Sequence, residues 1–209
     1  VQPAASILLA NDGAHWKVAD AAAPAGLRKQ HDLQGPINDA FLDAFLCVTP
    51  SGTAYSPLLE QRDKDELARF ETMMAKEYRG AARTKADTAI TPADIAANNL
   101  VLFGDPGSNK LIAQIADKLP IKWTRDSIVV GDKSYSAADH LPVLIYPNPL
   151  NPSRCVVINT GLVTGRGAGS EYGDYAVLKM NKGEGDAIAT EVADGGVFDE
   201  SWQLPAPPR

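Results

Sequence analysis

The sequence predicts an α/β protein with a flavodoxin-like or Rossmann-like three-layer core around a mostly parallel sheet, preceded by an N-terminal β-hairpin. Short apolar runs alternate with amphipathic helical segments between residues 44 and 119, as in a βαβ series. Residues 143–146 and 155–158 are continuously apolar, a pattern typical of strands buried on both faces. Together these patterns indicate one central sheet with helices packed on it.

The N-terminal part of the chain is predicted to be a hairpin followed by a connector. Two short β-prone runs within residues 6–19 flank an Asn-Asp-Gly turn at 11–13, which favours a β-hairpin. Alanine, proline and glycine dominate residues 21–26, which we interpret as a linker. A short helix is then expected at 36–43, opened by proline, and an apolar strand at 44–48.

Residues 58–78 are predicted to form one long amphipathic helix. Leu67, Phe70, Met74 and Tyr78 recur at spacings of three and four, which places them on one face that we expect to contact the core. Such a stripe is more typical of a core surface than of a cofactor site. The charged residues assigned to the opposite, solvated side are Asp63, Lys64, Asp65, Glu66, Arg69, Glu71 and Lys76.

A second strand and helix pair follows the long helix. Thr91 and Pro92 are suited to a helix cap and first helical position, so a short helix is expected to reach residue 98. An apolar strand at 100–103 then leads through a polar loop into a helix that ends near residue 119. The crossovers of this βαβα series should be right-handed. Further strands are expected at 121–123, 128–130, 143–146, 155–159 and 175–178.

Length and charge restrict the kind of protein. The 209 residues suffice for a full hydrophobic core, and we predict a hairpin and linker at 1–26, one α/β domain at 27–203 and a proline-rich tail at 204–209. Linker-like ends favour a piece of a longer polypeptide. The formal net charge of −6 disfavours nucleic acid as a partner. No apolar run approaches the roughly 18 residues of a membrane span, so we expect a soluble chain.

Catalytic motifs are sparse. A serine hydrolase of the α/β type needs Gly-x-Ser-x-Gly at a strand-to-helix turn, and this pentapeptide does not occur. A triad would have to use His140, whose place at a strand entry also suits a simple loop hydrogen bond. Cys47 and Cys155 lie in apolar runs, where burial disfavours the reactive thiolate. Metal-ligand spacings and cofactor motifs are missing too, and we expect no metal and no cofactor.

Polar residues follow the predicted strands at 44–48 and 100–103. The carboxyl ends of parallel strands form the crevice in which open α/β sheets bind ligands. The loop at 104–110 joins a strand to a helix but lacks the Walker A and dinucleotide-binding patterns. Ser108 or Asn109 equally suits a helix N-cap. The ligand-binding candidates at this edge are Thr49, Ser51, Asp105, Ser108 and Asn109.

Three prolines make residues 146–152 the most unusual stretch of the chain. Because proline fixes φ, we expect an extended, rigid loop after a buried strand. This loop either aims the next strand or holds Asn148 and Asn151 as polar contacts for a ligand or partner. His140 completes the set of ligand-binding candidates. Residues 161–173 are rich in glycine and are predicted to form a flexible loop or a lid.

Three stretches of the sequence look familiar. They are residues 29–37 (Lys-Gln-His-Asp-Leu-Gln-Gly-Pro-Ile), 99–109 (Asn-Leu-Val-Leu-Phe-Gly-Asp-Pro-Gly-Ser-Asn) and 146–152 (Tyr-Pro-Asn-Pro-Leu-Asn-Pro). Over roughly residues 15–203 the chain resembles the carboxy-terminal region of prolyl-oligopeptidase-like or esterase-like α/β-hydrolase proteins of environmental bacteria. In that family the catalytic serine belongs to a separate hydrolase domain. The resemblance therefore implies an accessory region and carries over no catalytic residue, and the pattern departs from the family after Gly161.

Three functions remain open at this point. The first is a non-catalytic accessory module of a larger extracytoplasmic hydrolase, periplasmic or secreted, which packs against the hydrolase domain of the same polypeptide or mediates assembly into a homo-oligomer. The second is a module that binds a small ligand at the carboxyl ends of its parallel strands. The third is a stand-alone hydrolase or amidotransferase-like enzyme that uses His140 with a cysteine or a serine.

Overall fold

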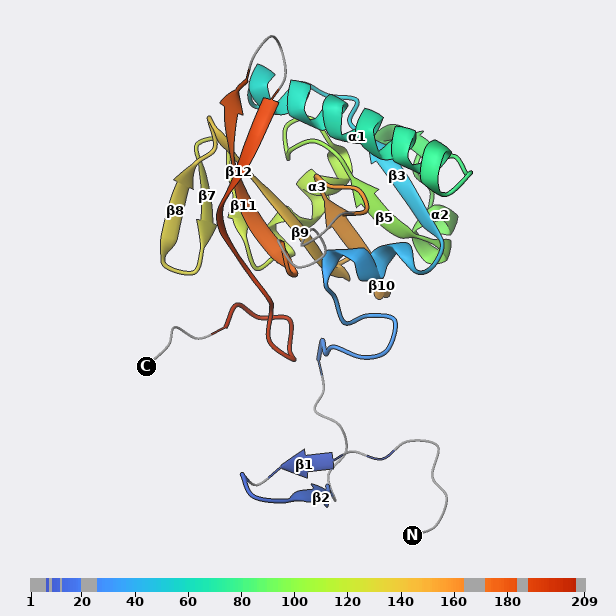
Figure 1. Cartoon of the computed structure of the whole chain (residues 1–209), viewed down its shortest axis with the longest axis vertical. Coiled ribbons are helices and arrows are strands. Elements are labelled where there is room, and N and C mark those ends of the chain that lie inside the picture. Colours follow the sequence, from blue (N-terminus) through green and yellow to red (C-terminus); the bar gives the residue numbers. More distant parts are fainter. Residues whose placement is uncertain are drawn as a thin grey trace.

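A seven-stranded sheet forms the centre of the protein (Figure 1). The computed structural model describes residues 7, 9–11, 13–19, 26–163, 172–183 and 188–205. The strands of the main sheet are β3 (Phe45–Thr49), β4 (Thr84–Ala86), β5 (Asn99–Leu102), β9 (His140–Asn148), β10 (Asn151–Ile158), β11 (Tyr175–Lys182) and β12 (Ile188–Gly196). Their order across the sheet is β12-β11-β9-β10-β5-β3-β4.

The sheet is mixed, so the prediction of a mostly parallel, flavodoxin-like or Rossmann-like core is wrong. Strands β4, β3, β5 and β10 are parallel neighbours, whereas β9, β11 and β12 pair antiparallel. The antiparallel half begins where Pro149 and Leu150 turn the chain directly from β9 into β10. The apolar runs could not reveal this reversal, because a central strand of a mixed sheet is also buried on both faces.

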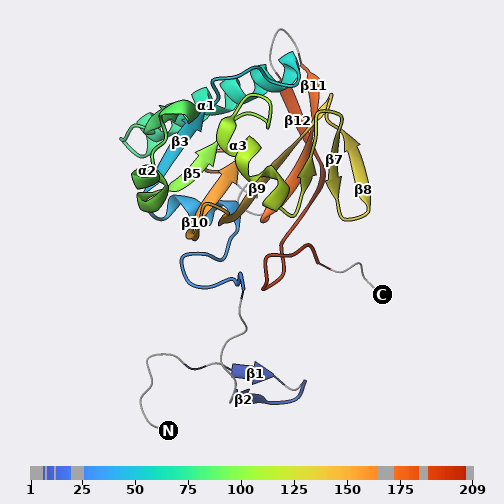
Figure 2. The same cartoon turned by 180° about the vertical axis from the view of Figure 1, so that it is seen from behind.

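Helices cover both faces of the parallel half of the sheet. They are η1 (Ile37–Phe41), α1 (Pro57–Glu77), η2 (Asp87–Ala89), α2 (Pro92–Ala97), α3 (Lys110–Ile115) and η3 (Ala116–Lys118). Figure 1 shows α1 in front of the sheet, and Figure 2 shows α2 and α3 on the opposite side. Ser56 caps helix α1 at its N-terminus, and its hydroxyl accepts from Leu59 N–H at 3.2 Å. Thr91 caps α2 in the predicted manner and forms a reciprocal capping box with Asp94.

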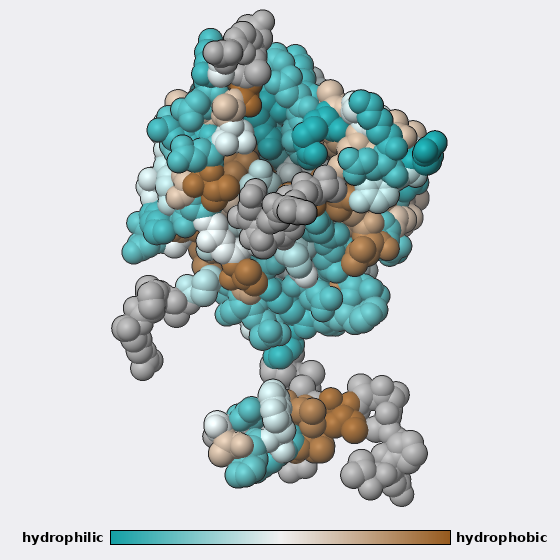
Figure 3. Space-filling model, in the orientation of Figure 1, coloured by the Kyte–Doolittle hydropathy of each residue, from teal (hydrophilic) through white to brown (hydrophobic). Residues whose placement is uncertain are grey.

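Two smaller antiparallel sheets accompany the main one. Strands β1 (Leu9–Asn11) and β2 (Trp16–Val18) form a hairpin in the region where one is expected. Strands β6 (Lys122–Trp123), β7 (Ser127–Val130) and β8 (Lys133–Ser136) form the other sheet. In the space-filling view, apolar side chains lie on the surface of the β1–β2 hairpin (Figure 3).

The buried apolar side chains form one cluster that extends from Leu33 to Trp202 along the sequence. Phe41 and Phe70 make an edge-to-face contact at 5.5 Å between ring centroids, which holds η1 against α1. A Cβ at Gly161 would lie 2.5 Å from the Phe70 ring, so the chain after β10 approaches α1 more closely than any residue except glycine allows. No helix among the described residues is long and apolar enough to cross a membrane.

The order of the parallel strands creates a crevice between β3 and β5. The chain leaves the carboxyl end of β3 through α1 toward β4, and it leaves the carboxyl end of β5 through α3 toward β9 and β10, on the other side of β5. Neighbouring connections that diverge in this way leave space outside the carboxyl ends of the two strands, which is where α/β sheets place their ligands. The carboxyl ends of β3 and β5 are therefore the first place to look for a site.

Candidate functional site

A pocket of about 220 Å³ lies at this edge, between the carboxyl ends of β3 and β5 and the first half of α1. Three segments contribute its walls. After β3 they are Thr49, Pro50, Gly52 and Ala54; on α1 they are Glu60, Asp63, Lys64 and Leu67; after β5 they are Phe103, Gly104 and Ser108. Most of the lining surface is apolar. Of the charged residues in the lining, Asp63 is buried.

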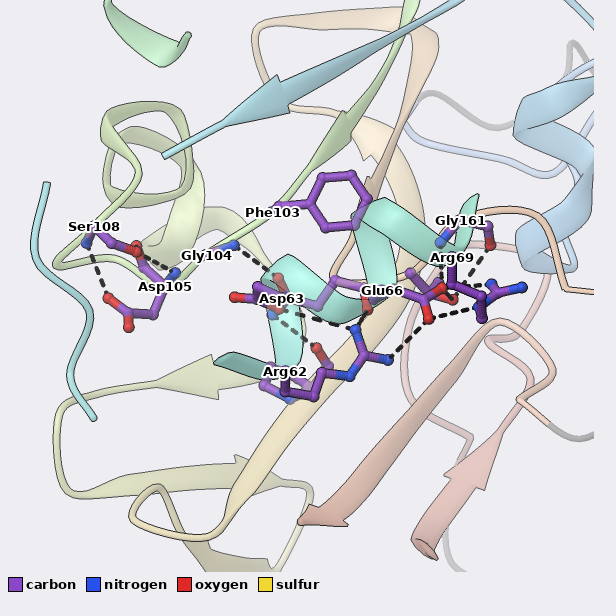
Figure 4. Close-up of polar contacts among 12 residues, drawn as sticks. Arg62, Asp63, Glu66, Arg69, Phe103, Gly104, Asp105, Ser108 and Gly161 are labelled. Carbon is purple, nitrogen blue, oxygen red and sulfur yellow. Dashed lines mark hydrogen bonds and ion pairs between the residues drawn. The ribbon is translucent and has the colours of Figure 1, made fainter. Parts of the chain in front are cut away.

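Asp63 is the chemically unusual residue of the pocket. Only 4% of it is exposed, and neither of its carboxyl oxygens has a hydrogen-bond partner among the described residues. Burial raises the pKa of Asp63 to about 7, and the Arg62 guanidinium offsets this only in part. Figure 4 marks a contact between the Gly104 N–H and the Asp63 carboxylate, which lowers the pKa of Asp63 and so opposes the effect of burial. The same N–H donates to Asn159 Oδ1 at 3.0 Å, so Asp63 only shares this donor.

Arg62 is buried next to Asp63 but makes its hydrogen bond to another segment of the chain. Its Nη1 donates to the carbonyl oxygen of Asn159 at 2.7 Å and lies 3.9 Å from Asp63 Oδ1. Its Nη2 lies 3.9 Å from Glu66 Oε2. Arg62 therefore reduces the electrostatic cost of burying Asp63 without satisfying either of its oxygens.

Glu66 joins α1 to the chain that follows β10. Its Oε1 accepts from Gly161 N–H at 3.0 Å and from Arg69 at 2.6 Å. Burial alone would raise the pKa of Glu66, but the bonds from Arg69 and Gly161 and the charge of Arg62 lower it overall. Glu66 is thus a satisfied, ionised carboxylate, in contrast to Asp63 one turn earlier.

These contacts correct the predicted orientation of α1. Asp63 and Glu66 do not lie on a solvated face, and the buried residues of the helix include Leu59, Arg62 and Asp63. Phe70 is buried as expected, whereas Tyr78 is 53% exposed. Arg62 and Glu66 turn inward because the backbone after β10 provides a carbonyl oxygen for Arg62 and an N–H for Glu66.

The loop after β5 is held by its own polar side chains. Asp105 accepts from the N–H groups of Tyr55 (2.7 Å), Gly107 (2.7 Å) and Ser108 (2.9 Å). Asn109 caps α3 by accepting from the N–H groups of Leu111 (3.0 Å) and Ile112 (3.3 Å), and its Nδ2 donates to Phe103 O at 2.8 Å. Asp105 and Asn109 therefore build the pocket rather than face into it.

Thr49 and Ser108 are the sequence-predicted candidates that line the pocket. The Thr49 hydroxyl donates to Lys85 O at 3.4 Å, and the Ser108 hydroxyl both accepts from Asp105 N–H at 2.9 Å and donates to Asp105 O at 3.3 Å. Ser51 does not line the pocket; it hydrogen-bonds the side chain of Asp87.

Asn148 and Asn151 lie at the opposite edge of the sheet, in the β9–β10 hairpin. The predicted rigid loop at 146–152 is instead strand, a two-residue turn and strand. Asn148 Oδ1 accepts from Leu150 N–H at 2.9 Å and thereby closes the turn. Asn151 Nδ2 donates to Ile95 O at 3.1 Å and ties the hairpin to α2. Both asparagines thus make structural contacts far along the strands from the pocket, and Asn148 Nδ2 is buried without a hydrogen-bond partner among the described residues.

His140 and the two cysteines do not form a dyad. His140 Nδ1 lies 2.7 Å from Asp139 Oδ1 and 3.1 Å from Ser136 O. Cys155 pairs with Pro147 on β9, which places it about 23 Å along that strand from His140. Burial raises the pKa of both cysteine thiols, Cys47 and Cys155, to about 12, so neither is a nucleophile at neutral pH. The described part of the chain also contains no cluster of metal-ligating side chains.

The sequence pattern places ligand-binding candidates at the carboxyl ends of β3 and β5, but it assigns Asp63 to a solvated face. Residues 59, 62, 63, 66, 70 and 73 fall at the spacing of one helical face. The apolar residues 59, 70 and 73 lie on both sides of the charged residues 62, 63 and 66. This charged interruption of an otherwise apolar face could have indicated that the charged residues are buried. The predicted lid at 161–173 lies mostly outside the described residues.

Comparisons of this chain with protein-family models, with curated proteins and with solved structures found no match. The fold and the pocket thus define a mixed α/β protein with a ligand-sized cavity at the carboxyl ends of two parallel strands.

Proposed function

We propose that this chain is a binding module that holds a small molecule in the pocket between β3, β5 and α1. The observation that carries the proposal is Asp63, a buried residue of the pocket lining whose carboxyl oxygens accept no well-formed hydrogen bond among the described residues and only share the N–H of Gly104. An unsatisfied buried polar group costs roughly 1–3 kcal/mol. A bound ligand that supplies the missing partner recovers this energy, which is a physical reason for the site to exist.

The pocket favours binding over covalent catalysis. Its two hydroxyl groups, on Thr49 and Ser108, are already engaged with backbone groups of the protein. A nucleophile needs a neighbouring base within hydrogen-bond reach, and His140 is occupied by Asp139 and Ser136 outside the pocket lining. The residues that line the pocket therefore include no nucleophile with a histidine base beside it.

A fragment screen against the whole chain tests the proposal. We expect small polar compounds of fewer than about ten heavy atoms to bind saturably, because the pocket of about 220 Å³ is smaller than the roughly 300–1,000 Å³ of drug-sized sites. Ala54→Phe, which places a ring at the pocket wall, should abolish that binding. Compounds that bind wild type and Ala54→Phe equally, or no binding at all, would overturn the proposal.

A second candidate is the accessory role in a larger extracytoplasmic hydrolase. It is supported by the resemblance and by the apolar side chains on the β1–β2 hairpin: Leu9, Trp16 and Val18 are 54%, 68% and 59% exposed. Exposed apolar residues gathered on one element favour a contact with another domain or another copy of the chain. The two candidates are compatible, since a ligand pocket can belong to an accessory module.

The genomic reading frame upstream of this chain tests the accessory role. A hydrolase domain with a Gly-x-Ser-x-Gly elbow encoded in the same frame is the expected result. A start codon or signal peptide directly before the hairpin would remove the support for this candidate. Sedimentation of the isolated chain then tests the homo-oligomer, which predicts a mass above that of one chain.

A further inference from the structure

We infer that the pocket takes a small organic cation of the alkylammonium class, whose N–H donors bind Asp63 while its carbon chain lies against the apolar walls. This inference rests on the proposed function, because it names the ligand class of the same pocket. It follows from three properties of the site: the unfilled acceptors of Asp63, the charges that surround it, and the composition of the walls.

The first property is the number of vacant acceptor positions. A carboxylate offers about four lone-pair positions, and Asp63 makes no well-formed hydrogen bond among the described residues. An ammonium group carries three N–H donors and no acceptor, so it is the complement of such a group. The final torsion of an aspartate side chain has a broad energy well. Both oxygens are buried, so binding requires the carboxylate to turn about this torsion toward a donor in the pocket.

The second property is the set of charges that face Asp63. On α1 these are Arg62, which is committed to Asn159 O, and Glu66, which is ionised. On the loop after β5, the negative charge of Asp105 acts on Asp63. The segment from 49 to 54 after β3 has no charged residue. Glu66 and Asp105 thus add two negative charges near Asp63, whereas Arg62 adds one positive charge. This balance favours a cation over an anion at this position.

The rim of the pocket carries one further ion pair. Glu60 Oε1 and Lys64 Nζ lie 2.6 Å apart on the outer side of α1. Because they neutralise each other, they leave the electrostatic preference of the interior unchanged. Asp63 is therefore the charged group of the lining that remains available to a ligand.

The third property is the apolar wall. Pro50, Ala54, Leu67 and Phe103 line the pocket around Asp63. Each buried methylene group contributes about 0.8 kcal/mol to binding, so a short carbon chain adds affinity that a bare ammonium ion lacks. A chain of about four carbons fits a pocket of about 220 Å³.

Calorimetric titration with n-butylammonium, n-butanol and n-butyrate tests the inference on the whole chain. Butylammonium stays protonated across the range, since alkylamines have a pKa near that of lysine, about 10.4. It requires ionised Asp63, whose pKa is about 7. Its dissociation constant should therefore rise roughly 30-fold from pH 8 to pH 5.5, whereas butanol should bind more weakly and independently of pH.

Asp63→Asn and Asp65→Asn are the matched pair of variants. Asp65 lies on the same helix, is exposed, and accepts only from Gln61 at 2.8 Å in the described contacts. Asp63→Asn should lose at least 30-fold in butylammonium affinity together with the pH dependence, and Asp65→Asn should retain both. Wild-type protein gives an independent readout: butylammonium binding near pH 6.5 should release a fraction of a proton as Asp63 ionises, seen by repeating the titration in buffers of different ionisation enthalpy.

The outcomes separate this inference from the proposed function. If butanol or butyrate binds and Ala54→Phe blocks it while butylammonium does not bind, the cation inference is wrong and the binding module stands. Butylammonium binding without pH dependence or proton release also overturns the inference. If none of the three compounds binds and a wider fragment screen is negative, both proposals fail.

Discussion

Arg62 Nη1 donates a 2.7 Å hydrogen bond to the carbonyl oxygen of Asn159, which joins α1 to the end of β10. Asn159 adopts a left-handed backbone conformation with φ of 56°, and its Oδ1 accepts from Gly104 N–H at 3.0 Å. One guanidinium and one asparagine thus connect three segments beside the pocket. Because Arg62 is used in this way, Asp63 is left buried with a cation 3.9 Å away and no hydrogen bond to it.

The first prediction concerns stability and pH. The pKa of Asp63 is about 7 in the folded protein against 3.8 for the free side chain, so between these values the folded state binds more protons than the unfolded state. Stability should therefore fall as pH rises, the opposite of the usual aspartate. We expect the ionisation of Asp63 to lower the free energy of unfolding by roughly 2–3 kcal/mol between pH 5 and pH 8.

Urea denaturation of wild type and Asp63→Asn at both pH values measures this effect. Asp63→Asn has no carboxyl group to ionise, so its free energy of unfolding should not fall for this reason. Its stability relative to wild type should therefore increase from pH 5 to pH 8. Asp65→Asn, on the exposed part of the same helix, should follow the wild-type profile. Parallel profiles for wild type and Asp63→Asn would show that Asp63 titrates near its ordinary value.

The second prediction concerns Arg62. Arg62→Met preserves much of the side-chain volume but leaves Asn159 O unpaired and Asp63 and Glu66 without their shared cation. Removing one partner of a buried ionic network costs about 3–5 kcal/mol. Lys64→Met is the control, because the Lys64 and Glu60 side chains of its ion pair are 66% and 51% exposed and such pairs contribute about 1 kcal/mol or less. Equal losses in the two variants, measured by urea denaturation at pH 7, would contradict the assigned role of Arg62.

Local signals in the sequence were sufficient for most helices and central strands. Thr91 and Pro92 set the start of α2 as expected, and the apolar run near Leu100 became β5. Three strands escaped prediction because their pattern is weak. Strand β12 has no buried residue and is mostly exposed, and β4 and β8 are short and largely polar. Edge strands need only one neighbour, so their composition carries little information.

Strand direction and the site depend on contacts between distant residues. The short connection between the apolar runs at 143–146 and 155–158 excludes a parallel crossover, which needs a dozen or more residues, and this signal was overlooked. Nothing local, however, specifies that Ile158 pairs antiparallel with Leu144 and parallel with Leu102. Asp63 was assigned to a solvated face because a charged residue on an amphipathic helix usually lies there. Its burial depends on the chain around Asn159, almost one hundred positions later. Such a partner cannot be read from the sequence of the helix.

The third prediction separates a structural from a binding role for Asn109. Asn109→Ala removes the cap of α3 and the buried bond to Phe103 O, which together should cost about 2–4 kcal/mol. Thr91→Ala, an exposed cap of α2, should cost only about 1 kcal/mol. Thermal unfolding measures both. If Asn109→Ala kept full stability but lost fragment binding, Asn109 would be a ligand contact rather than a brace.

The fourth prediction concerns the two thiols. Burial raises the pKa of Cys47 and Cys155 to about 12, so at pH 8 on the order of one molecule in ten thousand carries a thiolate. We expect the native chain to resist iodoacetamide at pH 8 over hours and both cysteines to be alkylated once urea unfolds it, as measured by intact mass. Labelling should therefore follow global unfolding, with the same urea midpoint as circular dichroism. Rapid alkylation of either cysteine in the native state would instead support the hypothesis of an enzyme that uses a cysteine, because only an accessible and activated thiolate reacts at that rate.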